Sequence, residues 1–273
     1  MSDLDPGMLA DYVIGIAERA GGEILNVYQG DFHVETKDDD SPLTAADRAA
    51  HACISLGLRE LTPQVPVLSE EDGFPDFEER RHWPRYWLVD PLDGTKEFIK
   101  RNGEFTVNIA LVEDGVPVLG VVHAPVLARS YLGVLGEGAE RRDEGGRTRI
   151  ATRALGDAPL TLVVSRSHRD AAVDRLLERL PACETTSVGS SLKFCLVAEG
   201  LADLYPRFGP TSEWDTAAAQ CLVEAAGGAV TRVDGTPLRY NRKASVLNPD
   251  FLAYGDPAHD WTRYLEGFAL NER

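Results

Sequence analysis

The sequence predicts a mixed helical and β-sheet protein whose two halves follow different patterns. Residues 86–135 contain several short β-type runs, and two of these runs flank an Asp-Gly dipeptide that is typical of a tight hairpin. From residue 160 onward, strand-like and helical segments alternate, as they do in α/β units. We therefore expect an α+β N-terminal subdomain over residues 1–155, which holds an antiparallel sheet, and an α/β C-terminal subdomain over residues 156–273.

The first half begins with helical periodicity. Apolar residues recur every three to four positions over residues 8–28 and again over residues 45–61. The strands expected in this half are residues 65–69, 86–89, 105–112, 116–123 and 130–135. Residues 74–85 are polar and contain proline, so they are expected to form a loop. Residues 137–149 are rich in glycine and charge, which predicts an excursion on the surface.

The second half is predicted as a series of alternating elements. The expected strands are residues 160–165, 183–188 and 202–205, and the expected helices are residues 170–180, 190–199 and 213–226. Gly227-Gly228 is suited to close the last of these helices, because glycine readily adopts the left-handed conformation at a helix end.

Composition excludes several classes of protein. The net charge of −16, from 28 basic and 44 acidic residues, argues against a protein that binds nucleic acid polymers, which would need a basic face. No apolar run approaches the roughly 20 residues of a membrane span, and the acidic N-terminus lacks the features of a signal peptide. The four cysteines show no CxxC spacing, so we expect buried free thiols and a cytoplasmic protein. Peripheral association with the inner membrane face stays open.

The segment Tyr86–Phe98, which reads YWLVDPLDGTKEF, holds the strongest chemical signal. An apolar run leads Asp90 and Asp93 into a turn that contains proline and glycine. Aspartate is common in turns because its side chain bonds nearby backbone N–H groups, but two acids directly after a buried strand exceed what a turn needs. Mg²⁺ prefers such oxygen ligands and keeps substrate phosphate in its coordination shell. The segment therefore indicates a site for hard divalent cations.

Further acids bear on the same site, and each has an ordinary alternative. Glu70-Glu71 follows the strand expected at 65–69, where it could instead be a solvated loop. Asp47 is expected in the first turn of the second helix, after a Thr44 cap, and Asp215 follows Ser212 at a helix start. Acids at both positions also resemble ordinary helix capping. The set as a whole indicates a metal site.

Three motifs together resemble the lithium-sensitive inositol monophosphatase superfamily. They are Ser69-Glu70-Glu71, Asp90-Pro91-Leu92-Asp93-Gly94-Thr95 and Glu213-Trp214-Asp215. The resemblance extends over nearly the whole chain. It implies a layered α-β-α-β-α sandwich of the sugar-phosphatase type, with the site between two subdomains.

The resemblance also implies roles for individual residues. Two or three Mg²⁺ ions would be held by Glu70, Asp90, the backbone carbonyl of Leu92, Asp93 and Asp215. The catalytic residues would be Asp47, Glu70 and Thr95, of which Asp47 and Thr95 orient the attacking water. Phosphate monoesters hydrolyse extremely slowly without a catalyst, and two metal ions can stabilise both the attacking and the leaving oxygen. No covalent phosphoenzyme is needed.

The second half resembles the CysQ-type 3′(2′),5′-bisphosphate nucleotidases of this superfamily. The residues that carry the likeness are GSSLKFCLVAEG at 189–200 and LYPRFGPT at 204–211. The implied reaction converts adenosine 3′,5′-bisphosphate, a by-product of sulfate activation, to AMP and phosphate. The implied substrate contacts are Gly94, Thr95, His168, Ser190, Lys193, Arg207 and Asp215. Ordinary surface contacts for Lys193 and Arg207, and loop capping for His168, remain alternatives.

Two other functions remain open from the sequence. A phosphatase of the same superfamily that acts on inositol phosphate or a sugar bisphosphate would share the metal site and differ in the pocket. A nucleotide- or metal-sensing module would bind without turnover, although such a module would have no need to keep Thr95. The oligomeric state is not predicted.

Overall fold

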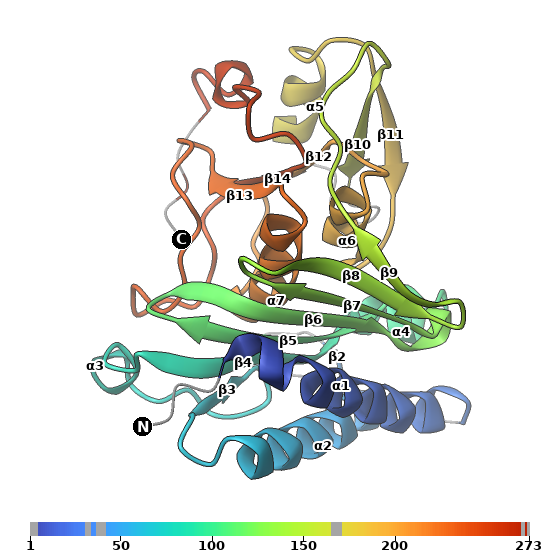
Figure 1. The fold of residues 1–273 in the computed structure, drawn as a ribbon, viewed down its shortest axis with the longest axis vertical. Helices are drawn as coiled ribbons and strands as arrows, with labels where there is room; N and C mark the ends of the chain where they lie inside the picture. The colour runs from blue at the N-terminus through green and yellow to red at the C-terminus, as the bar shows by residue number, and fades with distance from the viewer. Residues whose placement is uncertain (1–4, 31–33, 37–41, 165–170, 269–270, 272–273) are drawn as a thin grey trace.

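The computed structural model describes residues 5–30, 34–36, 42–164, 171–268 and 271. Five layers are stacked along the long axis of the molecule (Figure 1). In order, they are helices α1 (Pro6–Tyr28) and α2 (Ala45–Leu61), a seven-stranded sheet, helices α6 (Leu192–Ala198) and α7 (Glu213–Ala225), a five-stranded sheet, and an outer layer with α5 (Ala171–Leu177). This is the predicted α-β-α-β-α order.

The seven-stranded sheet has the order β3-β4-β5-β6-β7-β8-β9. Its strands are β3 (Val67–Ser69), β4 (Arg85–Asp93), β5 (Thr106–Glu113), β6 (Val116–Ala124), β7 (Arg129–Val134), β8 (Gly138–Asp143) and β9 (Gly146–Ile150). Only β3 and β4 pair in parallel. The predicted hairpin is present, because Asp114 and Gly115 join β5 to β6 with positive φ angles of 47° and 78°.

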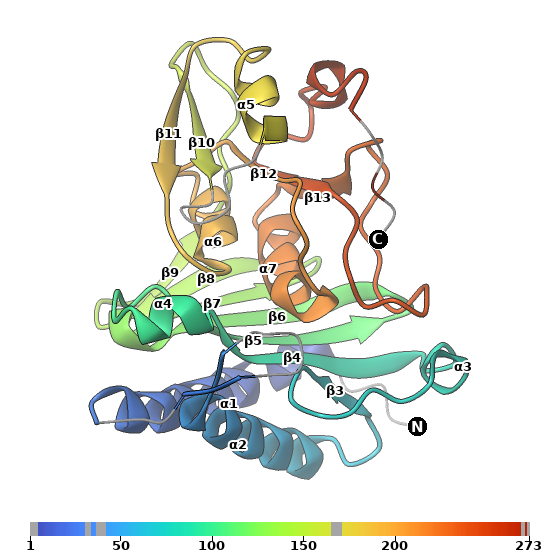
Figure 2. The same cartoon turned by 180° about the vertical axis from the view of Figure 1, so that it is seen from behind.

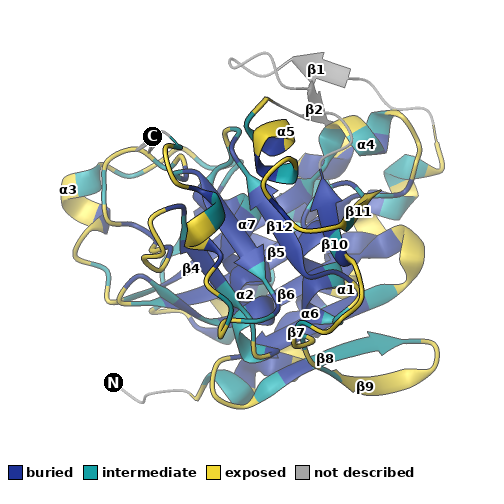
Figure 3. Ribbon diagram, turned by 90° about the horizontal axis from the view of Figure 1, so that it is seen from above, coloured by how far each residue is buried: buried dark blue, intermediate teal, exposed yellow. Residues whose placement is uncertain are grey.

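The segment 137–149, predicted as an excursion on the surface, is an ordered hairpin. These residues form β8 and β9, which extend the sheet at one edge. β9 is largely exposed, as Figure 3 shows. Charged side chains are common on edge strands, where they discourage pairing with other chains. The high charge of this segment therefore reflects its edge position rather than an absence of sheet structure.

The five-stranded sheet has the order β11-β10-β12-β14-β13. Its strands are β10 (Leu160–Val164), β11 (Cys183–Ser187), β12 (Leu204–Arg207), β13 (Ala229–Arg232) and β14 (Phe251–Tyr254). β10, β11 and β12 run parallel, whereas β14 is antiparallel to both of its neighbours. The last two strands were not predicted. The two sheets are separated in the chain, since the first ends at Ile150 and the second begins at Leu160.

Helix α7 packs closely against the first sheet (Figure 2). Gly120 on β6 and Gly133 on β7 make this approach possible. A Cβ at Gly120 would collide with the carbonyl oxygen of Ala218, and a Cβ at Gly133 would lie 2.6 Å from the Cα of Leu222. The helix start, which bears Asp215, is therefore held at a fixed place above the sheet.

Smaller elements complete the described part of the chain. They are β1 (Val34–Thr36), β2 (Pro42–Thr44), α3 (Phe77–Arg80), α4 (Thr95–Ile99), η1 (Pro125–Leu127) and η2 (Thr262–Tyr264). The expected loop at 74–85 thus contains a short helix. None of the helices among these described residues combines the length and apolar character that a membrane crossing requires.

The four cysteines are free, as predicted, but they are not all buried. Cys195 and Cys221 are buried, whereas Cys53 and Cys183 are half-buried.

Candidate active site

Asp90 and Asp93 lie inside strand β4, and not in a turn after it as the sequence suggested. Asp90 is opposite Asn108 and Asp93 is opposite Thr106 on β5, with an irregular register between the two pairs. Proline and the bulge that accommodates it account for the turn-like sequence. Gly94 follows with a φ of 94°, and a Cβ there would lie 3.2 Å from the carbonyl oxygen of Glu104. The chain can therefore turn directly into α4 at Thr95.

The remaining predicted acids reach the same place from other elements. Glu70 directly follows β3, and its backbone N–H donates to the carbonyl of Val89 at 3.1 Å. Asp47 lies fully buried in the first turn of α2, and Asp215 lies in the first turn of α7. Burial raises the pKa of Asp90 well above 3.8, and the negative charges of Glu70, Asp93, Asp215 and Asp47 raise it further. The structure thus brings the five acids together.

Asp215 serves as a helix cap as well as a member of this cluster. Its Oδ2 accepts a hydrogen bond of 2.8 Å from the backbone N–H of Ser212. The capping alternative is therefore correct, but it does not exclude a second role. Burial is the main reason that the pKa of Asp215 is raised well above 3.8, followed by the charges of Asp93 and Glu70. A carboxylate that only capped the helix would not need these acidic neighbours.

Asp93 lies among groups that raise its pKa and groups that lower it. Burial raises its pKa to about 6, although the charge of Lys193 and the backbone N–H of Ser191 act in the opposite direction. The Asp93 side chain points into a cavity of about 130 Å³ between the two sheets.

The donor set fits Mg²⁺. It consists only of carboxylate oxygens and the Leu92 carbonyl, which also accepts a hydrogen bond of 3.4 Å from Thr95 Oγ1. Such oxygen ligands suit a hard cation, and a cation would offset the mutual repulsion of the buried acids. Among the described residues, no group of three or more Asp, Glu, His or Cys side chains is arranged so that it could hold a metal ion. The charges of Glu70, Asp93, Asp215 and Asp47 nevertheless all act on Asp90, so these acids share one region.

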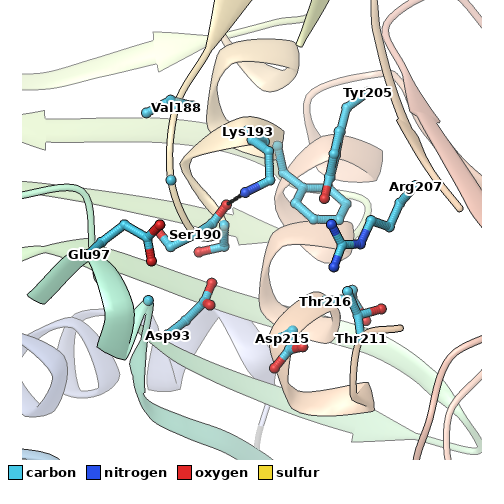
Figure 4. A pocket seen from close by; sticks show the side chains of 14 residues that line it. Asp93, Glu97, Val188, Ser190, Lys193, Tyr205, Arg207, Thr211, Asp215 and Thr216 are labelled. Atoms are coloured by element: carbon cyan, nitrogen blue, oxygen red, sulfur yellow. Dashed lines mark hydrogen bonds between the residues drawn. The ribbon is translucent and has the colours of Figure 1, made fainter. Parts of the chain in front are cut away.

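Basic groups lie across the cavity from these acids (Figure 4). Lys193 on α6 is 8% exposed, and its Nζ donates to the carbonyl of Ser190 at 2.5 Å. Burial lowers the pKa of Lys193 to about 8, and the charge of Asp93 acts against this change. Arg207 ends β12, where it donates to the carbonyl of Pro210 at 2.8 Å. Its buried Nε has no hydrogen-bond partner among the described residues.

The start of α6 differs from the prediction. The helix begins at Leu192, and Ser190 lies before it with a φ of 46°. Ser191 does not offer its hydroxyl to the cavity, because Ser191 Oγ donates to Asn108 Oδ1 at 2.7 Å and lies 2.7 Å from Thr106 Oγ1. Thr106 and Asn108 were missed in the sequence. Two polar residues at alternate positions, just before the apolar run of β5, were the signal that could have found them.

Glu97 and Glu104 were also missed. Glu97 lines the cavity, and Glu104 accepts a hydrogen bond of 2.9 Å from the backbone N–H of Gly189. Of the predicted substrate contacts, the cavity is lined by Gly94, Ser190, Lys193, Arg207 and Asp215. Thr95 lies next to it at the start of α4, and His168 is outside the described residues.

Five layers with a charged cavity between the two sheets define a fold of the sugar-phosphatase class. The model of the inositol monophosphatase family matches residues 7–261. The chain belongs to the inositol monophosphatase family.

Individual relatives agree with this assignment. The 3′(2′),5′-bisphosphate nucleotidase CysQ of Escherichia coli K12 is 56% identical over 246 residues, which cover 89% of this chain and 98% of that protein. A crystal structure of CysQ from Bacteroides thetaiotaomicron has 44% identity and a TM-score of 0.79, and covers 89% of this chain and 96% of that one. The inositol monophosphatase of Anabaena sp. PCC 7120 has 29% identity and a TM-score of 0.75, with 95% and 96% covered.

Proposed function

We propose that the protein is a Mg²⁺-dependent 3′(2′),5′-bisphosphate nucleotidase that converts adenosine 3′,5′-bisphosphate to AMP and phosphate. The observation that carries the proposal is the separation of charge across one cavity. Asp93 and Asp215 lie on one side, whereas Lys193 and Arg207 lie on the other. A substrate with two phosphates suits this arrangement, because one phosphate can meet the metal ions while the basic groups bind the other. The similarity to CysQ nucleotidases supports the same substrate.

Glu70, Asp90, Asp93, Asp215 and the carbonyl of Leu92 would hold two or three Mg²⁺ ions. Bound Mg²⁺ would polarise the phosphoryl group, activate water and offset the charge of the leaving oxygen. The chain's own acids set the conditions for binding, because their burial and mutual repulsion disfavour the metal-free ionised state.

Asp47 and Thr95 orient the attacking water in this proposal. Asp47 is fully buried, so its carboxylate is shielded from bulk solvent. Thr95 starts α4, and its hydroxyl lies within 3.4 Å of the Leu92 carbonyl oxygen. A hydroxyl and a carboxylate on separate elements can fix both the position and the orientation of one water molecule. Glu70 joins them as a catalytic residue because it lies beside the same acids.

The second phosphate is bound by Lys193 and Arg207. The Arg207 guanidinium can donate two hydrogen bonds to one phosphate, which is the geometry that arginine favours. Ser190, Gly94 and His168 complete the proposed nucleotide contacts. The bisphosphate is thus held at both ends while its ribose spans the cavity.

A phosphate-release assay tests the proposal. Adenosine 3′,5′-bisphosphate and inositol 1-phosphate are compared at equal concentration with Mg²⁺, and EDTA serves as the control. Faster release from the nucleotide is expected, with loss of activity in EDTA and inhibition by Li⁺. Preference for inositol 1-phosphate would favour the other phosphatases of the family. Tight nucleotide binding without phosphate release would favour a sensor.

Two further expectations belong to the proposal. We place the division between the subdomains near residue 155, which is supported by the break between the two sheets. We also place the protein in the cytoplasm, which is supported by the free cysteines.

A further inference from the structure

His51 joins the helix that bears Asp47 to the turn that bears Glu70. It lies on α2, four residues after Asp47, so both side chains project from the same face of the helix. His51 Nδ1 lies 2.9 Å from Ser69 Oγ, and His51 Nε2 lies 3.3 Å from Asp72 Oδ1. The His51 ring therefore contacts Ser69, which precedes the pair Glu70-Glu71, and Asp72, which follows it.

The donors and acceptors of this group form one directed chain. The Asp72 carboxylate can only accept when ionised, so the tautomer of His51 that fits this contact carries its hydrogen on Nε2. His51 Nδ1 is then an acceptor for the Ser69 hydroxyl, and Ser69 Oγ accepts the backbone N–H of Glu71 at 3.4 Å. Each group has a partner in this one tautomer. Ser69 is fully buried at the end of β3, so the group is not a nucleophilic triad.

The contacts of His51 add to the backbone hydrogen bonds of this turn, in which the Glu70 N–H donates to the Val89 carbonyl at 3.1 Å and the Asp72 N–H donates to the Ser69 carbonyl at 3.2 Å. β3 is only three residues long, and its pairing with β4 ends at Ser69. Residues 70–76 form turns and irregular structure before α3 begins. At the far side, Phe74 stacks on Trp214, with ring centroids 5.1 Å apart and an angle of 11° between the planes. His51 thus holds the near end of the turn, and Phe74 holds the far end.

We propose that His51 is a positioning residue that fixes Glu70 relative to Asp47 and thereby sets the affinity for metal ions. The inference rests on the proposed function, because it assigns Glu70 to the metal site. Substitution of a residue that orients metal ligands without binding the metal itself typically lowers metal affinity or activity by about 10- to 100-fold. His51 does not touch the metal or the substrate in this proposal.

The experiment compares three variants with the full-length wild-type protein. H51A removes both contacts, and H51N keeps an acceptor near Ser69 while it loses Asp72. H82A removes an exposed histidine outside this cluster and serves as the matched control. Binding of Mn²⁺ without nucleotide is followed by electron paramagnetic resonance. The Mg²⁺ dependence of phosphate release and the KM for nucleotide at saturating Mg²⁺ are measured beside it.

We expect H51A to raise the Mn²⁺ dissociation constant and the Mg²⁺ half-saturation by about tenfold or more. We expect H51N to recover part of this loss, and KM at saturating Mg²⁺ to stay within about threefold of wild type in both. Unchanged Mn²⁺ binding in folded H51A would overturn the inference, as would a loss of the same size in H82A. If H51A does not fold, the Mn²⁺ dissociation constant of H51N alone decides whether the inference stands.

The same data separate this inference from the proposed function. If the wild type binds Mn²⁺ but releases no phosphate, the proposed function fails while the binding series still tests His51. If the wild type is active and H51A binds metal normally, only the role of His51 fails.

Discussion

Replacement of Asp93 by asparagine should stabilise the metal-free protein while it removes most of the activity. Asparagine has nearly the same size as aspartate and can still accept the N–H of Ser191 that approaches Asp93. It lacks the charge that Mg²⁺ would bind in the proposed site. The two effects have opposite signs, so loss of activity cannot be explained by unfolding.

The magnitude follows from the pKa of Asp93. Burial raises it from 3.8 to about 6, which corresponds to about 3 kcal/mol of the free energy of unfolding. This is an upper limit because the side chain keeps partial contact with solvent in the cavity. The folded protein binds the proton more tightly than the unfolded chain. Proton binding by Asp93 therefore adds its full amount to the free energy of unfolding below pH 3.8, and this addition is lost as the pH rises through about 6.

Urea unfolding in EDTA measures this difference directly. At pH 8, D93N is expected to be more stable than wild type by up to about 3 kcal/mol, and the difference should shrink as the pH falls toward 4. Mg²⁺ should then raise the stability of wild type more than that of D93N. D114N is the control, because it makes the same exchange at the exposed hairpin tip.

Two results would refute this reasoning. Lower stability of D93N than wild type at pH 8 without metal would mean that the Asp93 charge is already well compensated. Full Mg²⁺-dependent phosphate release by D93N would exclude Asp93 as an essential ligand. An effect of D114N equal to that of D93N would show that the change is not specific to the cavity.

Two other substitutions test the second phosphate and the packing of α7. R207Q should raise KM for adenosine 3′,5′-bisphosphate by about 10- to 100-fold, since a hydrogen bond to a charged group contributes about 1.5–3 kcal/mol. KM for adenosine 3′-monophosphate should change little, and an equal loss on both substrates would contradict the assignment. G120A should lower the free energy of unfolding by about 1–3 kcal/mol or more, because its Cβ meets the Ala218 carbonyl. G156A, where a Cβ meets nothing, is the control in the same urea titration.

The site acids could be predicted from the sequence because they break the local pattern. Two aspartates at the end of an apolar run have no packing role, and Glu70-Glu71 directly follows a short strand. What the sequence could not indicate was the path of the backbone between Asp90 and Asp93. The strand continues through Pro91 with an irregular register, and such continuity depends on pairing with β5, which lies far along the chain.

Strands β13 and β14 could not be predicted from the sequence for a different reason. β13 and β14 have four residues each, and the segment between them is irregular. β14 pairs with β12 on one side and with β13 on the other, so both strands are formed by contacts distant in sequence rather than by local propensity. The position of the Ser191 hydroxyl could not be predicted for a similar reason, because its partners Asn108 and Thr106 lie on β5, far away in the sequence.

The two halves of the chain contribute opposite charges to one cavity, and this arrangement constrains the mechanism. Among the charged residues that line this cavity, Asp93 and Glu97 come from the first half, whereas Lys193 and Arg207 come from the second. Asp215 is the exception among the described lining residues, because it is an acid from the second half.

A bisphosphate that meets both charge groups must span the boundary, so its binding depends on how the halves are joined. The hydroxyl contacts of Ser191 with Thr106 and Asn108 form such a joint, directly beside Asp93. A nucleotide with one phosphate depends on fewer of these contacts. Loosening the joint should therefore impair hydrolysis of the bisphosphate more than that of the monophosphate, even though the Ser191 hydroxyl faces Thr106 and Asn108 rather than the substrate.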